Sequence, residues 1–560
     1  MLAVLICGSL LAKPLLARLN VDQDVAFKYA TLAQSLTSSI TKLMTEDEVP
    51  GVAIGLVDGQ QVVWAHGFGV ADLAKQTPVT PDTIFSLQSI SKSYTATAFL
   101  RAVDRKAIGL DDRLIDMLPG FTVRDRFGGK EARRITMRHL LAHWAGLCQE
   151  APVGNNYGDW HCGFAEHIES IKDTWLRSPV GSRYRYSNLG IDLAGFVLSK
   201  RLGMPFEDLM QAELLRPLGM RDSSFRRSDL AGSNRIATGY IDLKSPVPEL
   251  EIPMVAAGGL YSTVNDMTKY VRFQLAGGRL NGEPWISPKA IRTMITPQFS
   301  EGPRGRGYGL GIQSRPFHGG RLCTHGGGGY GFGTIQSWMP DYQIGVVVLT
   351  NGDQGGDLSE EVARDALEGM IWIKKGHLPD EAPYVHDRRP EISLAPSQLQ
   401  RYAGTYKATS GLAEFRVEGG KLHFHRQHND VTLLARSPTE FTDAAMTQSY
   451  RFDLGSDGAP TGVLQLGDVG QDYMVLNDRV GEPRGPDRPE WREFVGDYTA
   501  LAYGQTVNQK VTLRNGYLYW ADSLKLFPHQ DRLFFTADGE AVVFGDRGMT
   551  YGNRAFTKKG

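Results

Sequence analysis

The chain has 560 residues, too many for one hydrophobic core, so we expect two to four domains. Its 61 lysines and arginines nearly balance its 62 aspartates and glutamates, which excludes electrostatic capture of nucleic acid or of an anionic membrane. An apolar content of 41% is typical of globular domains, and 64 glycines favour many turns and β structure.

The N-terminal segment is apolar but short. Its first twelve residues, MLAVLICGSLLA, are too few to span a bilayer, and we expect no stable membrane span. They look like the apolar region of a signal peptide, although a basic start and a clear cleavage site are missing. We therefore interpret residues 1–21 as a leader-like segment and expect export to the periplasm or the medium, with the cytoplasm as the alternative.

Residues 22–376 predict one α+β domain. An amphipathic helix covers 25–48, Asp58-Gly59 is a hairpin signal, and a helix begins near Ser89. Helices and loops follow up to about residue 300, and a last helix covers 356–373. The predicted β runs are 51–59, 61–70, 307–314, 331–340 and 343–351. Two early and three late strands predict one antiparallel sheet, flanked by helices, that joins both ends of the domain.

After Gly376 the composition changes. Residues 377–394 form a linker rich in proline and charge. A weak repeat then relates YAGTYKAT and FRVEGGKLHF to FVGDYTAL and VTLRNGYLYW, about ninety residues later. We predict two β-barrel-like modules, 395–480 and 488–560, each too small for a catalytic apparatus of its own. We expect them to cap the cleft of the first domain; assembly of a homo-oligomer and binding of a polymer are the alternatives.

Cysteine and histidine patterns are less specific. Cys148 and Cys162 could close a disulfide loop worth roughly 3 kcal/mol in an oxidising compartment, or remain two thiols, and the sequence leaves both open. His423 and His425 alternate on one face of a strand, but no third ligand has metal-like spacing. We therefore expect neither a metal nor another cofactor.

The stretch FSLQSISKSYTA, residues 85–96, contains the first pattern with chemical meaning. Ser89 and Lys92 stand at i and i+3 of the predicted helix, so they share a face. A lysine desolvated beside a serine can lose its proton and act as the base that activates the hydroxyl. The same spacing occurs at Ser39 and Lys42 in the N-terminal helix, where we expect a structural role.

A second pattern lies in RYRYSNLGIDLAG, which places Tyr186 and Asn188 two residues apart before a helix. A strand-like spacing points both side chains the same way. A phenolate near an ammonium can act as a general base, and an amide can bind a substrate carbonyl. The alternative is a buried tyrosine followed by an N-capped helix start.

The third pattern is CTHGGGGYGFGTIQSWMPD, in which His325 precedes four glycines at the beginning of predicted β structure. Glycines in a strand permit close approach of a ligand to the backbone. A backbone N–H group there could form half of an oxyanion hole. The alternative is a glycine-rich turn beside a hydrogen-bonded histidine.

In this order, Ser-x-x-Lys, Tyr-x-Asn and His-Gly-Gly resemble the motifs of serine hydrolases related to penicillin-binding proteins and class C β-lactamases. The resemblance covers residues 25–375 and implies a β-lactamase/transpeptidase-like fold. The stretches that support it are RLIDMLPGF, TMRHLLAHWAGL, SPVGSRYRYSNLG, LLRPLGMRDSSF and AAGGLYSTVNDMTKY.

The resemblance also implies roles for single residues. Ser89 would be the nucleophile, with Lys92 and Tyr186 as its proton relay. The backbone N–H groups of Ser89 and Gly328 would form the oxyanion hole. The residues implied to bind or support the substrate are Asn188, His325 and Gly327.

Two departures from the family pattern bear on the substrate. His325 stands where β-lactamases have a lysine, which removes a permanent cation suited to a substrate carboxylate. A histidine there resembles D-aminopeptidases, esterases and the peptidase-like branch of the family. The paired C-terminal modules resemble the three-domain layout of D-aminopeptidases. Ala142, Trp144 and Ala145 replace the usual small hydroxyl-bearing residues and would reshape one pocket wall.

The sequence therefore predicts a hydrolase that cleaves amide or ester bonds of a small-molecule or peptide substrate through an acyl-Ser89 intermediate. The alternatives are a β-lactamase and a non-catalytic β-lactam-binding sensor. Because ester, D-peptide and β-lactam cleavage use the same machinery, the motifs do not choose among these substrates.

Overall fold

The computed structural model describes residues 25–559 except 156–161, 250, 300–304, 381–388, 409–410, 427–428, 445–446, 468–469, 483, 486–487 and 503–504. The leader-like segment 1–21 and the centre of the predicted linker therefore lie outside the described residues.

The first domain is built on an antiparallel sheet in which both ends of the domain meet. Its central pair is β1 with β14, where Val52 lies opposite Thr350. These strands are almost 300 residues apart in the chain, and the helical insert lies in the sequence between them. In sheet order the strands are β10 (Gly307–Tyr308), β11 (Gln313–Phe317), β12 (Gly320–Gly329), β13 (Phe332–Met339), β14 (Ile344–Thr350), β1 (Gly51–Asp58), β2 (Gln61–Asp72) and β3 (Thr77–Pro78).

The predicted antiparallel sheet is confirmed, with corrections to its late strands. The run predicted over 307–314 is split into β10 and β11, because Gly311 turns the chain with φ of 67° and approaches the Lys92 carbonyl too closely for a side chain. Between the predicted runs lies β12, and His325 is in its middle rather than at the start of β structure.

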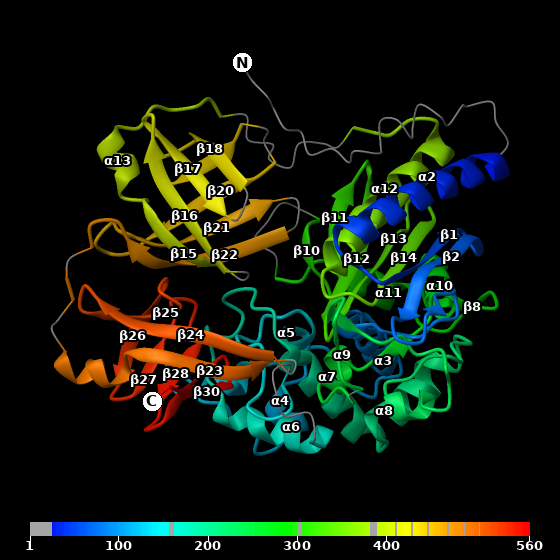
Figure 1. Cartoon of the computed structure of the whole chain (residues 1–560), viewed down its shortest axis with the longest axis horizontal. Coiled ribbons are helices and arrows are strands. Elements are labelled where there is room, and N and C mark those ends of the chain that lie inside the picture. Colours follow the sequence, from blue (N-terminus) through cyan, green and yellow to red (C-terminus); the bar gives the residue numbers. More distant parts are fainter. Residues whose placement is uncertain are drawn as a thin grey trace.

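Helices cover both faces of the sheet (Figure 1). On one face, α2 (Val25–Glu46) and α12 (Gly355–Lys375) enclose an apolar cluster that includes Leu32, Val348 and Met370. On the other face lie α3 (Ser91–Asp104) and α10 (Val264–Leu275), with the larger core. The remaining helices of the insert are α4 (Leu114–Met117), α5 (Met137–Leu141), α6 (Phe164–Ser170), α7 (Asn188–Leu202), α8 (Phe206–Met210), α9 (Val255–Gly258) and α11 (Pro288–Ile295).

Short two-stranded ribbons link these helices. They are β4 (Phe85–Ser86) with β7 (Tyr261–Ser262), β5 (Tyr240–Asp242) with β6 (Ser245–Pro246), and β8 (Arg279–Leu280) with β9 (Glu283–Pro284). None of the helices in the described part of the chain is both long and apolar enough to cross a membrane.

Two closed antiparallel barrels follow, stacked beside the first domain (Figure 1). The short helix α13 (Pro396–Gln400) leads into the first barrel. Its strands are β15 (Gly404–Ala408), β16 (Gly411–Glu418), β17 (Lys421–Arg426), β18 (Asn429–Ala435), β19 (Glu440–Asp443), β20 (Ser449–Leu454), β21 (Pro460–Gly467) and β22 (Gly470–Arg479). Those of the second are β23 (Gly496–Ala502), β24 (Gln505–Arg514), β25 (Tyr517–Trp520), β26 (Leu524–Gln530), β27 (Leu533–Phe535), β28 (Ala541–Phe544), β29 (Gly548–Tyr551) and β30 (Arg554–Lys558).

The internal repeat has a structural counterpart in these barrels. Tyr406 donates its hydroxyl hydrogen to the carbonyl of Tyr402 at 3.0 Å, and Tyr498 donates to the carbonyl of Phe494 at 2.8 Å. Both tyrosines are buried in the aromatic core of their barrel. An equivalent tyrosine therefore ties the segment before the first strand of each barrel to the barrel core.

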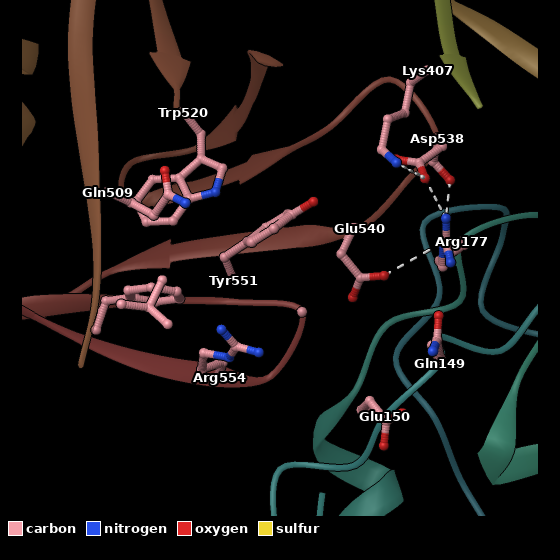
Figure 2. A pocket seen from close by; sticks show the side chains of 13 residues that line it. Gln149, Glu150, Arg177, Lys407, Gln509, Trp520, Asp538, Glu540, Tyr551 and Arg554 are labelled. Atoms are coloured by element: carbon pink, nitrogen blue, oxygen red, sulfur yellow. Dashed lines mark hydrogen bonds and ion pairs between the residues drawn. The ribbon is translucent and has the colours of Figure 1, made fainter. Parts of the chain in front are cut away.

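Both barrels contact the first domain through arginines of the insert. Arg177 pairs with Asp538 of the second barrel, and its Nε lies 3.4 Å from Glu540 Oε2 (Figure 2). Burial raises the pKa of Asp538, but the positive charge of Arg177, Lys407 and Arg185 outweighs burial and lowers the pKa to about 2. On the first barrel, the Arg183 guanidinium lies 3.7 Å from the ring centre of Tyr473.

The charge of Asp538 should make barrel docking sensitive to acid. Because its pKa falls from 3.8 to about 2 on folding, its contribution to stability is complete above pH 3.8 and is lost as the pH falls toward 2. Asp538→Asn should cost about 2–3 kcal/mol at neutral pH, because Arg177 and Lys407 lose a buried carboxylate partner and only Glu540 remains beside Arg177. The unfolding temperatures of parent and variant should converge near pH 2. A difference in unfolding temperature that stays constant from pH 7 to pH 2 would contradict this.

Candidate active site

Ser89 lies in a short 3-10 helix, η1 (Gln88–Ile90), that leads into α3. Gln88 before it has φ of 51°, a conformation that non-glycine residues rarely adopt. The buried Gln88 side chain donates to Ser86 Oγ at 2.7 Å, which helps hold this turn. Backbone strain of this kind is found at functional sites, where the surroundings enforce it.

Lys92 is on the first turn of α3 and reaches back to Ser89. Its Nζ lies 2.9 Å from Ser89 Oγ and 2.8 Å from the carbonyl oxygen of Ala257 in α9. The Ala257 N–H in turn donates to Asp192 Oδ1 at 2.9 Å, so the carbonyl that holds the lysine is itself fixed from α7. The i, i+3 prediction for Ser89 and Lys92 therefore corresponds to a direct contact.

Tyr186 completes this group from the chain segment before α7. Its hydroxyl donates to Ser89 Oγ at 2.8 Å, and its ring centre is 5.0 Å from Lys92 Nζ. The next residue, Ser187, caps α7 by accepting the N–H of Gly190. Ser187 therefore provides the N-cap of the alternative interpretation, while the partly buried Tyr186 points its hydroxyl at Ser89.

Asn188 is the first residue of α7, and its side chain points toward a loop, Cys148–Glu150. Its Nδ2 donates to Glu150 Oε1 at 2.7 Å. Its buried Oδ1 has no hydrogen-bond partner among the described residues. A buried acceptor left in this way is suited to an N–H group of a ligand. In the same loop the Cys148 thiol donates to the Glu150 carbonyl, and Cys148 and Cys162 are not joined in a disulfide.

His325 is buried in β12 and bonded to a residue that the motifs did not indicate. Its Nε2 lies 2.8 Å from the hydroxyl oxygen of Tyr308 in β10. Burial, with the nearby charge of Lys92, lowers the pKa of His325 to about 3, so its imidazole is neutral at neutral pH. His143 is another buried imidazole, and its ring centre lies 4.4 Å from that of Tyr186. Burial and the charge of Lys92 lower the pKa of His143 as well.

The sequence motifs do not indicate Tyr308 or His143, for different reasons. Tyr308 lies inside a predicted strand, and only the sheet brings it to His325. His143 lies in the stretch TMRHLLAHWAGL, and its φ of 63° belongs to a turn that the pattern does not show.

Two of the four glycines after His325 have different surroundings. A side chain on Gly327 would meet the backbone directly before η1, since an added Cβ would lie 2.1 Å from the carbonyl oxygen of Leu87. On Gly328 an added Cβ would meet nothing within 4 Å. Gly327 therefore seats β12 against the segment that carries Ser89, and Gly328 borders open space.

That space is a cavity of about 310 Å³ which begins at Ser89, Tyr186 and Gly328. It extends between strands β11–β13 and helix α12. Its lining in the described structure comes from the first domain, with a buried apolar part, Phe317, Leu322, Ile335, Ala363 and Leu367, and a charged part, Arg315, Glu360 and Arg364.

His423 and His425, the alternating histidines of the stretch HFHRQH, both lie near the carboxylate of Asp430. His423 Nδ1 lies 3.6 Å and His425 Nδ1 3.9 Å from the carboxylate of Asp430. Searching the described residues finds no cluster of three or more histidine, cysteine, aspartate or glutamate side chains able to hold a metal ion.

The first domain is similar in sequence to a known protein family, and most of the chain is similar to a bacterial relative. A family model described as Beta-lactamase matches residues 36–369. Penicillin-binding protein 4* of Bacillus subtilis (strain 168) is 24% identical over 429 residues, which cover 73% of this chain and 91% of that protein.

Two solved structures share the fold. The octameric penicillin-binding protein homologue from Pyrococcus abyssi superposes with a TM-score of 0.54 at 24% identity, covering 79% of this chain and 99% of that one. EstCE1, described as a hydrolase with promiscuous acyltransferase activity, gives a TM-score of 0.53 at 22% identity and covers 60% of this chain and 99% of its own. The fold expected from the sequence motifs is thereby confirmed.

The same substitution at the two glycines should have different effects on stability. Gly327→Ala should lower the unfolding temperature, because overpacking against a backbone carbonyl costs about 1–3 kcal/mol. Gly328→Ala is the matched control and should leave the unfolding temperature unchanged. Differential scanning calorimetry of both variants checks this, and equal unfolding temperatures would contradict the close approach of β12 to η1.

Proposed function

The chain belongs to the beta-lactamase family, and on that premise we propose that it is a serine hydrolase that cleaves ester or amide bonds through an acyl-Ser89 intermediate. One observation carries the proposal. Ser89 Oγ lies within hydrogen-bond distance of both Lys92 Nζ (2.9 Å) and the Tyr186 hydroxyl (2.8 Å), at the mouth of a cavity. A hydroxyl between a lysine and a tyrosine can lose its proton as it attacks.

In the proposed reaction Ser89 Oγ attacks the substrate carbonyl carbon, and its proton passes to the Lys92–Tyr186 pair. The carbonyl oxygen becomes an oxyanion, which the backbone N–H groups of Ser89 and Gly328 would stabilise. The bond to the leaving group then breaks, and the pair returns a proton to the departing alcohol or amine. Water attacks the acyl-enzyme in the same way and releases the acid.

The neutral His325 supports substrates without a carboxylate at this position. A lysine in its place would be a permanent cation, whereas a buried imidazole bonded to Tyr308 offers only hydrogen bonding. Ordinary esters and amides therefore fit better than penicillins. A β-lactamase remains the second candidate, and a β-lactam-binding sensor would be acylated without release.

The cavity and Asn188 support a more specific substrate. The apolar lining between α12 and the sheet suits an aliphatic or aromatic arm. Asn188 Oδ1, buried two residues after Tyr186 and without a hydrogen-bond partner among the described residues, would accept from a substrate N–H group. We therefore propose that the preferred substrate has an apolar arm several atoms long, and that amides and esters are both cleaved.

The test of the mechanism is a pair of serine variants. Ser89→Ala should abolish turnover and covalent labelling by a fluorophosphonate probe, because the attacking oxygen is lost. Ser39→Ala should leave both nearly intact, because Ser39 is buried in α2 and its partner in the motif, Lys42, is exposed and paired with Glu46. In-gel fluorescence and hydrolysis of p-nitrophenyl acetate measure the two effects. Labelling that persists in Ser89→Ala would falsify the assignment.

The test of the substrate class is a chain-length series of p-nitrophenyl esters, run with D-amino-acid amides and nitrocefin. Ala363→Phe fills the apolar part of the cavity and should lower kcat/KM for long acyl esters at least about tenfold relative to the acetate. Ala74→Phe, at an exposed position outside the cavity, is the control. If Ala363→Phe lowered activity equally for all chain lengths, the cavity would not hold the substrate arm.

A further inference from the structure

The loop Cys148–Glu150 connects the candidate active site to the second barrel. On its inner side it holds the start of α7. The Cys148 carbonyl accepts the Ser187 hydroxyl at 2.6 Å, and the Gln149 carbonyl accepts the Asn188 N–H at 3.1 Å. The Glu150 carboxylate accepts the Asn188 side chain at 2.7 Å. Tyr186 precedes these two anchored residues directly, so a shift of the loop would move both Tyr186 and Asn188.

On its outer side the same loop is held by Asn553, at the tip of the second barrel. Asn553 Nδ2 donates to the Glu150 carbonyl at 2.6 Å and lies 3.5 Å from Cys148 Sγ. The Asn553 carbonyl accepts from Asn155 Nδ2 at 3.4 Å. One side chain of the barrel is therefore two hydrogen bonds away from Asn188.

The backbone at this tip is suited to hold the amide in place. Gly552 and Asn553 form the two-residue turn between β29 and β30, with φ of 57° and 60°, and Tyr551 pairs with Arg554 on either side. Such a turn favours glycine and asparagine, because both central residues need positive φ. The hairpin therefore presents the Asn553 amide in a defined direction.

A cavity beside the loop Cys148–Glu150 leaves the loop more dependent on its hydrogen bond to Asn553. Beside Gln149 and Glu150 lies a cavity of about 270 Å³, which also reaches Tyr551, Glu540 and Arg177 (Figure 2). Part of the outer side of the loop therefore faces open space rather than packed side chains. Hydrogen bonds have to supply the order that packing supplies elsewhere.

We propose that Asn553 is a positioning residue of the active site: through the loop Cys148–Glu150 it fixes Asn188 and Tyr186, so that the second barrel takes part in the reaction. This inference rests on the proposed function. It gives the barrel a role different from covering the cavity, because the barrel acts on the scaffold behind the site.

The experiment uses the full chain with two substitutions at one position. Asn553→Gly keeps the positive φ and removes the amide, and Asn553→Asp keeps the shape and replaces the donor by an acceptor facing the Glu150 carbonyl. The control is Arg126→Ala, which removes a contact between Arg126 and Phe535 at the same interface, 4.2 Å to the ring centre, and leaves the loop contacts intact.

Both Asn553 variants should lower kcat for p-nitrophenyl ester hydrolysis by about 10–100-fold with little change in KM, because misplaced groups affect the reaction more than binding. Hydrogen exchange followed by mass spectrometry should become faster over residues 148–150 and 186–190. Arg126→Ala should leave kcat and these exchange rates unchanged.

Other results would overturn the inference. If Arg126→Ala lowered kcat as much as Asn553→Gly, general docking of the barrel would explain the effect. If neither kcat nor exchange responded to Asn553→Gly, Asn553 would have no positioning role. Faster exchange in a chain whose Ser89 is never labelled by a fluorophosphonate would support the link between barrel and loop and reject the proposed hydrolase activity.

Discussion

The burial of Lys92 is the constraint on which the candidate site depends. Its side chain has no exposed surface. An ammonium or amine in such a place costs several kcal/mol unless hydrogen bonds replace the lost water. Ser89 Oγ and the Ala257 carbonyl supply these bonds, and the Tyr186 ring face lies 5.0 Å away. The elements that carry these groups, η1, α9 and the start of α7, must therefore meet around one nitrogen atom.

Burial, together with the charge of this lysine, determines the protonation state of two neighbouring histidines. His143 and His325 are both buried near it, and burial together with its charge lowers the pKa of each imidazole. Both rings are therefore neutral at neutral pH and can act only as hydrogen-bonding groups. Tyr308 is the hydrogen-bond partner of His325, and Lys92 lies in direct contact with Ser89.

The barrels are joined to this site through charge and hydrogen bonding. Arg177, buried in the insert, has Asp538 and Glu540 on the second barrel as partners, and burial alone would lower its pKa whereas these carboxylates raise it. Glu150 accepts from Asn188 on one side and from Asn553 on the other. The second barrel is in this way connected to the groups around Ser89.

The sequence by itself determined the parts of this protein that depend on local spacing. Ser89 and Lys92 were predicted to meet because three residues span one helical turn, and the hairpin at Asp58-Gly59 and the helices at 25–48 and 356–373 follow from local patterns. The paired barrels were predicted from a repeat, which conserves the core tyrosines Tyr406 and Tyr498.

Only the tertiary structure decided which distant residues meet. Tyr308 reaches His325 through the sheet, Ala257 reaches Lys92 through α9, and Asn553 reaches Glu150 across a domain boundary. No periodicity marks such contacts, because they join segments 17 to 403 residues apart whose approach depends on the packing of whole domains. The neutral state of His325 was likewise invisible in the sequence, since it results from burial beside a lysine that is far away in the chain.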